Sequence, residues 1–237
     1  TITVGSDTYP PYVYMDNNGD ITGLDVDIAE EAFRRMGYRA EFTTIDWEQK
    51  TKLVDNGEID CIWDCFSMDG REEEYQWAGP YLHSRQVVAV RSDSDIYTLQ
   101  DLADKVVAVQ STTKPEELFL NAEQNGLPRL RRLYSLQNRD LLYTTLLKGY
   151  ADALAAHESA IRQFMKDYSV EYRILDEPLM TARLGVAFAK ERGDDLPQQL
   201  TEVFQEMLAD GTVRQIVSRY LDDPEHYLDG LEDSTHA

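Results

Sequence analysis

Residues 57–66, Gly-Glu-Ile-Asp-Cys-Ile-Trp-Asp-Cys-Phe, decide the fold, because the chain repeats their pattern further along. Residues 149–156, Gly-Tyr-Ala-Asp-Ala-Leu-Ala-Ala, lead through the same Gly-x-x-Asp turn into a second apolar run. Each turn follows a segment with helical spacing, so each marks the end of a helix and the start of a strand. The repetition indicates two lobes of similar topology, although glycine caps and aspartate turns also recur in any α/β chain.

Outward from these two phrases, strands and helices alternate along most of the sequence. Apolar runs predict strands at residues 2–5, 39–45, 61–66, 86–91, 106–110, 130–134, 153–156, 172–175 and 184–189. Helical spacing of apolar residues predicts helices at residues 24–36, 47–56, 115–125, 138–148, 159–168, 196–207 and 213–220. Such alternation is typical of an α/β fold with mostly parallel sheets flanked by helices.

The order of these elements predicts where the two lobes begin and end. The last two helices lack partners in the second lobe, so we expect them to return to the first. Lobe 1 then comprises residues 1–90 and 186–237, and lobe 2 comprises residues 91–185. The two crossings, near Arg91 and Gly185, would form a two-strand hinge.

The composition restricts the classes of partner. Among 237 residues, 44 acidic side chains outnumber 23 basic ones, for a net charge of −21. A charge of that sign repels nucleic acid and anionic lipid, so neither is expected as a partner. No apolar run reaches the roughly 18 residues of a membrane span. The chain starts directly with a strand pattern, so we expect either a cytoplasmic protein or one whose signal or anchor was removed.

The two cysteines, Cys61 and Cys65, lie in one run that is predicted to be a strand. At about 3.3 Å per residue their Cα atoms would be roughly 13 Å apart, whereas a disulfide needs less than about 7 Å. We therefore expect two free thiols. None of the four histidines is spaced with them as a zinc pair, so no metal and no cofactor are predicted.

Two polar clusters follow strands of the first lobe, at the strand ends where ligands of open α/β sheets bind. After the first strand, Tyr9 and Tyr12 flank two prolines and offer an aromatic wall with hydroxyls. After the run that contains the cysteines come Ser67 and Arg71, and an arginine fork matches a carboxylate bidentately. The alternatives are plain loop packing for the tyrosines and, for the arginine, a surface ion pair with a glutamate among residues 72–74.

Two further clusters follow strands of the second lobe. Ser111, Thr112 and Thr113 end one strand just before a helix, where they either cap that helix or help it to hold an anion. His157 and Glu158 follow the strand of the second Gly-x-x-Asp phrase. A histidine in that place is more often structural or solvated than a ligand contact. Four polar clusters at four strand ends, two in each lobe, are the arrangement that a cleft between lobes requires.

With these residues in place, the sequence resembles the family 3 extracellular solute-binding proteins, the periplasmic amino-acid receptors of ABC transporters. It also resembles the same module where it serves as the sensing domain of membrane histidine kinases. The matching segments are residues 9–12, 23–29, 57–60, 67–71, 109–113, 149–153 and 209–212. The resemblance spans residues 1–221 and implies the type II periplasmic-binding-protein fold, a clamshell of two α/β lobes joined by two strands.

The resemblance also implies residue roles. Tyr9 and Trp47 match positions whose rings flank the ligand side chain. Arg71 matches the arginine that pairs with the ligand α-carboxylate, helped by Ser67 and by Thr113 with its neighbouring amides. Further matched positions line the cleft, and the full set of candidate ligand contacts is Tyr9, Tyr12, Trp47, Asp64, Cys65, Ser67, Arg71, Ser111, Thr112, Thr113, His157 and Glu158.

Two departures from the family pattern bear on the ligand. The family commonly places an acidic residue where this chain has His157, and that carboxylate binds the ligand α-ammonium. Asp64 or Glu158 would have to supply the negative charge instead. The segment from Ser67 to Arg71 is also one residue shorter than in many relatives, which shifts the guanidinium. The resemblance therefore predicts an amino acid or a related carboxylate as the ligand.

We expect a monomer outside the cytoplasm that binds a small polar solute by lobe closure and catalyses no reaction. Its partner would be an ABC permease or a membrane-tethered signalling protein. The tail after Leu221 is acidic and poorly patterned, so we expect a linker there, which favours the signalling role. The alternative is an enzyme like the cyclohexadienyl dehydratases of the same fold, with His157 or Glu158 as the general acid.

Overall fold

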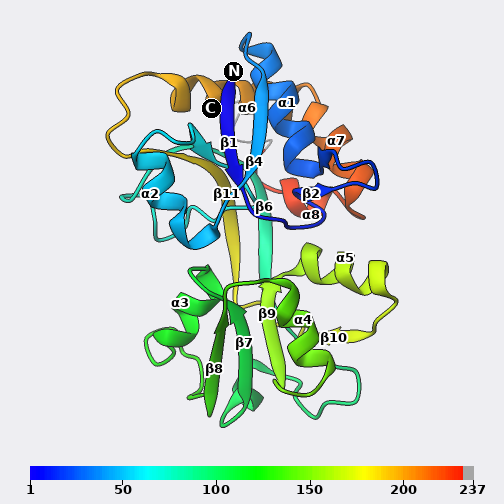
Figure 1. Cartoon of the computed structure of the whole chain (residues 1–237). Helices are drawn as coiled ribbons and strands as arrows, with labels where there is room; N and C mark the ends of the chain where they lie inside the picture. The colour runs from blue at the N-terminus through cyan, green and yellow to red at the C-terminus, as the bar shows by residue number, and fades with distance from the viewer. Residues whose placement is uncertain (232–237) are drawn as a thin grey trace. The chain divides into compact units, whose positions relative to one another are not determined.

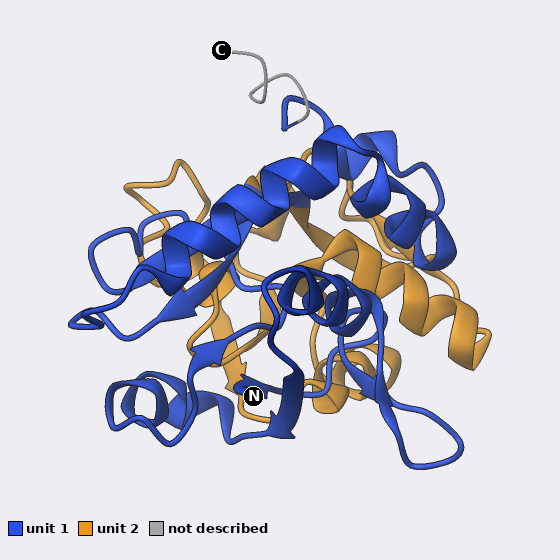
Figure 2. Cartoon of the chain, turned by 90° about the horizontal axis from the view of Figure 1, so that it is seen from above, with its two compact units in different colours: residues 1–84, 182–237 blue, residues 85–181 orange. Residues whose placement is uncertain are grey.

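The computed structural model describes residues 1–231, which divide into two compact units (Figures 1 and 2). Unit 1 comprises residues 1–84 and the chain from residue 182 onward, and unit 2 comprises residues 85–181. Each unit is an α/β structure built on its own part of a mixed sheet. Among the described residues, no helix is long and apolar enough to cross a membrane.

Two strands carry the chain between the units. They are β6 (Gln76–Arg91) and β11 (Met180–Phe188). The unit boundaries fall within both strands, after Ser84 and after Thr181. The boundaries expected from the sequence, after residues 90 and 185, lie inside the same two strands.

The sheet of unit 1 has the strand order β4 (Ala40–Thr44), β1 (Ile2–Ser6), β5 (Cys61–Ile62) and β11. β1 runs parallel to both β4 and β5, with Val4 opposite Phe42 on one side and Cys61 on the other. β11 is antiparallel to β5. Because β1 and β5 are parallel, the segments that leave their carboxyl ends emerge at the same edge of the sheet.

Three long helices of unit 1 pack together: α1 (Leu24–Arg35), α6 (Leu196–Ala209) and α7 (Thr212–Tyr220). The predicted apolar stripe of α1 is buried, from Leu24 through Ile28 to Phe33, as a period of 3.6 residues requires. Gly37 follows the helix with φ +79°, the left-handed conformation that glycine adopts readily at this position. As expected, α6 and α7 belong to unit 1, where each contacts α1 (Figure 1).

The sheet of unit 2 repeats the parallel pattern. Its central strand, β7 (Val106–Gln110), lies parallel to β8 (Arg132–Leu136) and to β9 (Ala153–His157). The second part of β6 pairs antiparallel with β9 and with β10 (Tyr172–Ile174). The carboxyl ends of β7, β8 and β9 therefore share one edge of this sheet.

Both faces of the unit 2 sheet are covered. Consecutive residues of β6 alternate between two hydrophobic clusters, with Val87 and Ala89 in one and Val88 and Val90 in the other. The first cluster includes side chains of α4 (Asp140–Leu147) and α5 (Glu158–Tyr168). The second includes side chains of α3 (Lys114–Leu120) and of the 3₁₀ turn η2 (Leu99–Leu102).

The strand expected at residues 61–66 is wrong beyond Ile62. Cys65 adopts the left-handed conformation, with φ +51°, and its N–H is bound by a side chain instead of by a neighbouring strand. Cys61 and Cys65 are both buried and free, so the predicted free thiols are confirmed. The argument from an extended spacing does not hold, however, since the chain turns before it reaches Cys65.

Helix boundaries differ from the expected ones in two places. The segment 47–56 is divided into the 3₁₀ turn η1 (Trp47–Gln49) and α2 (Lys50–Asp55). The helix expected at residues 115–125 is α3, which stops at Leu120. At the end of α3, the side-chain amide of Asn121 donates to the carbonyl oxygen of Glu117, so a polar side chain binds the backbone where the expected helix would have continued.

Besides the 3₁₀ turn η2, two features were not predicted. One is a short hairpin of β2 (Tyr14–Met15) and β3 (Ile21–Thr22). The other is α8 (Glu225–Leu228), within the segment expected to be a linker. Tyr227 and Leu228 are buried, so residues 222–231 are packed chain and the linker prediction is wrong for them. Its remainder, residues 232–237, lies outside the described residues.

Candidate functional site

The predicted site residues lie at the carboxyl ends of parallel strands in each unit. In unit 1, the loop with Tyr9 follows β1 and the segment with Arg71 follows β5. In unit 2, Ser111 follows β7 directly and His157 is the last residue of β9. The strand pairing therefore brings the candidate residues together as two groups, one at the binding edge of each unit, where binding edge means the carboxyl end of its parallel strands.

The tyrosine loop of unit 1 is rigid and packed. Tyr9 and Tyr12 are buried, with their ring centres 5.7 Å apart. Backbone bonds between Tyr9 and Val13 close the loop. Gly23 then passes so close that a Cβ there would lie 2.2 Å from the carbonyl oxygen of Tyr12, and its φ of +136° also requires glycine. The aromatic wall is thus fixed by the start of α1.

Phe66, which the sequence analysis did not select, is the centre of the aromatic part of the site. The indole of Trp47 packs edge-on against it, with ring centres 5.3 Å apart. The guanidinium carbon of Arg71 lies 5.1 Å from the same ring centre, within the range of a cation–π contact. Tyr75 and Trp77 also lie against Phe66, with ring centres 5.6 and 5.2 Å from its own. Phe66 therefore links the predicted aromatic and cationic ligand contacts.

Arg71 is held from within its own loop. Its side chain is 9% exposed, and Nη1 donates to the carbonyl oxygen of Ser67 at 3.2 Å. The alternative of a surface ion pair with the following glutamates is disfavoured, because Glu72 pairs with Arg183 at 2.7 Å and Glu73 pairs with Lys190 at 3.5 Å. The bond to the Ser67 carbonyl orients the guanidinium, and a fixed orientation favours bidentate pairing with a carboxylate.

Asp25 positions the backbone at Cys65. Its Oδ2 accepts the Cys65 N–H at 2.7 Å and its Oδ1 accepts the Tyr81 hydroxyl at 2.8 Å. The carboxyl is fully buried, and this burial raises the pKa of Asp25 to about 7. On the other side of this turn, Asp64 is buried and its Oδ2 accepts the Asp7 N–H at 3.1 Å.

In unit 2, the polar residues after β7 bind the local backbone. Thr113 is the N-cap residue of α3, but its hydroxyl donates to the carbonyl oxygen of Gln110 at 2.6 Å and forms no side-chain cap. The Thr112 N–H is bound by Glu116 at 2.7 Å, and Thr112 itself has φ +57°. The Ser111 N–H donates to the carbonyl oxygen of Leu136. Helix capping by the Thr113 side chain is therefore not the role of this cluster.

The carboxylate of Glu158 lies against two arginines of unit 2. Arg162 donates two bonds to its Oε1, at 2.8 and 2.6 Å, and Arg85 lies 3.3 Å from its Oε2. Both carboxylate oxygens are thus engaged within unit 2, which disfavours Glu158 as an ammonium partner or as a general acid. The neighbouring His157 is buried, with its Nε2 2.8 Å from the side-chain nitrogen of Gln86.

Two buried cations at the binding edges were missed by the sequence analysis. Lys50 is the first residue of α2 in unit 1, and Arg139 precedes α4 just after β8 in unit 2. Lys50 is 6% exposed and Arg139 is 8% exposed. Lysine and arginine are mostly exposed in proteins, and no local sequence pattern distinguishes these two, so their burial could be seen only in the fold.

No group of three or more potential metal ligands occurs among residues 1–231.

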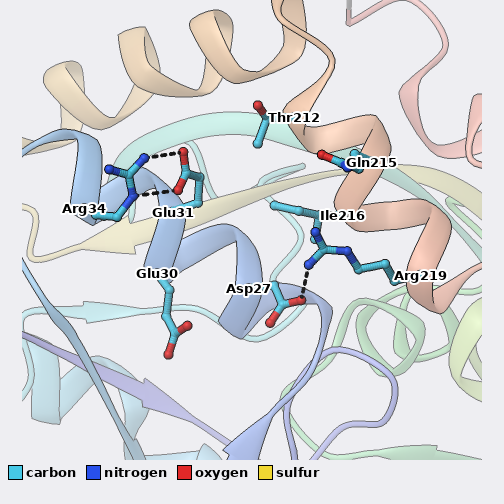
Figure 3. Close-up of a pocket in the computed structure, with 8 residues that line it drawn as sticks. All are labelled: Asp27, Glu30, Glu31, Arg34, Thr212, Gln215, Ile216 and Arg219. Atoms are coloured by element: carbon cyan, nitrogen blue, oxygen red, sulfur yellow. Dashed lines mark hydrogen bonds and ion pairs between the residues drawn. The ribbon is translucent and has the colours of Figure 1, made fainter.

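A groove in unit 1 is lined by none of the predicted site residues. This groove lies between α1 and α7, has a volume of about 440 Å³ and is strongly charged (Figure 3). Glu31 in its wall binds Arg34, and Asp27 accepts bonds from Arg219 and from the hydroxyl of Tyr220. Two of the three carboxylates that line the groove are therefore paired with its two arginines, and Glu30 is the third carboxylate.

Two α/β units joined by two strands, each with polar side chains at the ends of its parallel strands, define a solute-binding protein. Residues 2–223 match the model of the bacterial extracellular solute-binding proteins, family 3, and the chain belongs to this family. The predicted family, fold, binding function and extracytoplasmic location are thereby confirmed.

The names of several relatives state the amino acid that each of them binds. The chain is 29% identical over 232 residues to the histidine-binding periplasmic protein of Escherichia coli K12, covering 93% of this chain and 87% of that protein. It is 26% identical over 240 residues to the glutamate-binding protein GluB of Corynebacterium glutamicum, covering 93% and 78%. A solved substrate-binding protein of an amino acid ABC transporter superposes with a TM-score of 0.82, at 25% identity, over 93% of this chain and 98% of that one.

Proposed function

We propose that the chain binds an amino acid or a closely related carboxylate and delivers it to an ABC permease. The observation that carries this is Arg71, a buried guanidinium at the binding edge of unit 1 that a backbone carbonyl orients and Phe66 supports. A buried arginine fork pairs with a carboxylate bidentately, whereas lysine offers only a point charge. The flanking Trp47 supplies apolar contact for a side chain.

The proposal includes both binding edges. In this proposal Tyr9 and Arg71 of unit 1, and Thr113 and His157 of unit 2, all contribute contacts to the solute. The solute would supply the driving free energy by binding the closed form better than the open one. A micromolar dissociation constant corresponds to about 8 kcal/mol at the standard state.

The permease as partner is supported by what the relatives are called. The substrate-binding protein that superposes on the chain belongs to an amino acid ABC transporter. A relative in Vibrio harveyi is named a putative amino-acid ABC transporter-binding protein. The acidic tail had favoured a signalling role, but its described part is packed chain with α8, so that argument no longer holds.

A thermal-shift screen of the purified protein tests the proposal. The panel contains the L-amino acids, small mono- and dicarboxylates, and polyamines as carboxylate-free controls. A ligand at about a hundred times its dissociation constant adds roughly 2.7 kcal/mol of stability, so we expect a clear rise in Tm with at least one carboxylate. A rise with polyamines alone, or with no compound that carries a carboxylate, would contradict the proposal.

A further inference from the structure

The segment that carries Arg71 is bound to β11 through backbone atoms. The Met68 N–H donates to the carbonyl oxygen of Arg183 at 2.8 Å, and the Gly185 N–H donates to the carbonyl oxygen of Phe66 at 3.0 Å. Both acceptor and donor on the far side of these bonds belong to β11, one of the two strands that carry the chain between the units. The segment is therefore paired with β11 directly before it reaches Arg71.

Close packing keeps this pairing in place. A Cβ on Gly185 would lie 2.7 Å from the Sδ of Met68 and 2.9 Å from the carbonyl oxygen of Ala78, so only glycine fits there without displacing a neighbour. From Met68 the chain turns, and the Arg71 N–H donates to the Met68 carbonyl oxygen at 2.9 Å. Backbone atoms thus place Arg71 beside β11, whatever side chain residue 183 carries.

The side chain of Arg183 binds the carboxylates on both sides of Arg71. Its Nε donates to Oδ1 of Asp69 at 2.9 Å, and its Nη2 donates to Oε1 of Glu72 at 2.7 Å. The backbone N–H of Arg183 also donates to Oδ2 of Asp69, at 2.7 Å. One guanidinium therefore engages the two acidic residues that are closest to Arg71 in the sequence, one on each side of it.

These two carboxylates are the same kind of group that the solute is proposed to present to Arg71. A guanidinium pairs with any carboxylate of suitable geometry. The backbone N–H of Glu72 and the charge of Arg183 lower the pKa of the Glu72 carboxyl, which is therefore ionised at neutral pH. Without Arg183, the charges of Asp69 and Glu72 would compete for Arg71 from within its own segment.

We propose that Arg183 is a positioning residue for solute binding, because it holds Asp69 and Glu72 and so keeps the Arg71 guanidinium for the carboxylate of the solute. Arg183 acts through these two carboxylates and makes no contact with the solute. The inference rests on the proposed function, which assigns the solute carboxylate to Arg71. The affinity should then depend on Arg183 only while Asp69 and Glu72 carry their charges.

Titration calorimetry on Arg183→Met in two backgrounds tests the inference. The probes are L-histidine, L-arginine, L-glutamate, L-glutamine and glutarate, and the one that the wild type binds most tightly is used for every variant. Methionine keeps an unbranched side chain and the backbone bonds of residue 183 but removes the charge. In the otherwise unchanged chain, Arg183→Met should weaken binding at least tenfold, because two uncompensated carboxylates then act on Arg71.

The second background carries Asp69→Asn and Glu72→Gln, which remove the competing charges and hardly change the size of either side chain. Asparagine at position 69 still offers an oxygen to the Arg183 backbone N–H. In this background Arg183→Met should change the affinity less than about threefold. A residue with a merely structural role would cost the same affinity in both backgrounds.

Arg192→Met is the matched control. Arg192 also binds one carboxylate with two nitrogens, since its Nε and Nη2 donate to Asp194 at 2.6 and 2.8 Å, but that carboxylate is remote from Arg71 in the sequence. We expect this variant to bind the probe within about twofold of the wild type. Urea unfolding shows that each variant is folded, and Arg183→Gln, which is also uncharged, replaces Arg183→Met if methionine prevents folding.

The outcomes separate this inference from the proposed function. Unchanged affinity in Arg183→Met, or an equal loss in both backgrounds, would overturn the inference. If Arg71→Ala still weakened binding in that case, the proposed function would remain intact. A wild type that binds none of the carboxylate probes would contradict the proposed function and, with it, the role of Arg183.

Discussion

Replacing Arg71 by alanine is expected to weaken binding of the carboxylate solute by 2 to 5 kcal/mol, about thirtyfold to several thousandfold. The guanidinium is buried over Phe66 and oriented by the Ser67 carbonyl. Alanine would therefore leave the solute carboxylate without the cation that pairs with it. Titration calorimetry on the wild type and the variant measures the change. Arg71→Lys should recover only part of the affinity, since an ammonium cannot form the bidentate pair.

Arg39→Ala is the matched control for this loss of an arginine. Its guanidinium is exposed and pairs with Glu41 at 3.4 Å, an interaction worth little in water. We expect this variant to bind the solute within about twofold of the wild type. Unchanged affinity in Arg71→Ala would remove Arg71 from the site and leave the solute's carboxylate without its assigned partner.

Replacing Asp25 by asparagine is expected to change the pH dependence of folding stability. Burial raises the pKa of Asp25 from 3.8 to about 7, so the folded chain holds this proton more tightly than the unfolded chain does. The stability due to that proton is complete below pH 4 and is lost as the pH rises through 7. Asparagine has no such proton.

Urea unfolding of both proteins between pH 4 and pH 8 measures this effect. The unfolding free energy of Asp25→Asn, relative to that of the wild type, should rise by about 4 kcal/mol over the range. The cause is desolvation and not a surface ion pair, so the rise should persist in 1 M salt. A pH-independent difference would show that the Asp25 carboxyl ionises as it does in the unfolded chain.

Much of this site could be predicted because it depends on strand ends. The apolar runs located β1, β5, β7 and β9, and parallel pairing then places whatever follows them at one edge of a sheet. Ser67 and Arg71 were identified in this way from residue types alone. The repeated Gly-x-x-Asp phrase was equally informative, since Asp60 accepts a backbone N–H of β1 and Asp152 accepts one of β7.

The rest depends on contacts between residues distant in sequence. Nothing near Asp25 shows that it binds Cys65 and turns the chain there, which is why β5 was predicted too long. Lys50 was overlooked because a lysine at the start of a helix is ordinarily exposed. The ion pair of Glu158 with Arg85 could not be predicted either, because Arg85 is remote from Glu158 in the sequence.

A crystal structure of the protein with its bound solute would test the central claim most directly. It should show the solute at the binding edge of unit 1, with a carboxylate bonded to the Arg71 guanidinium and the chain of the solute against Trp47. A solute bound elsewhere, for instance in the charged groove between α1 and α7 (Figure 3), and making no contact with the Arg71 guanidinium would contradict the account.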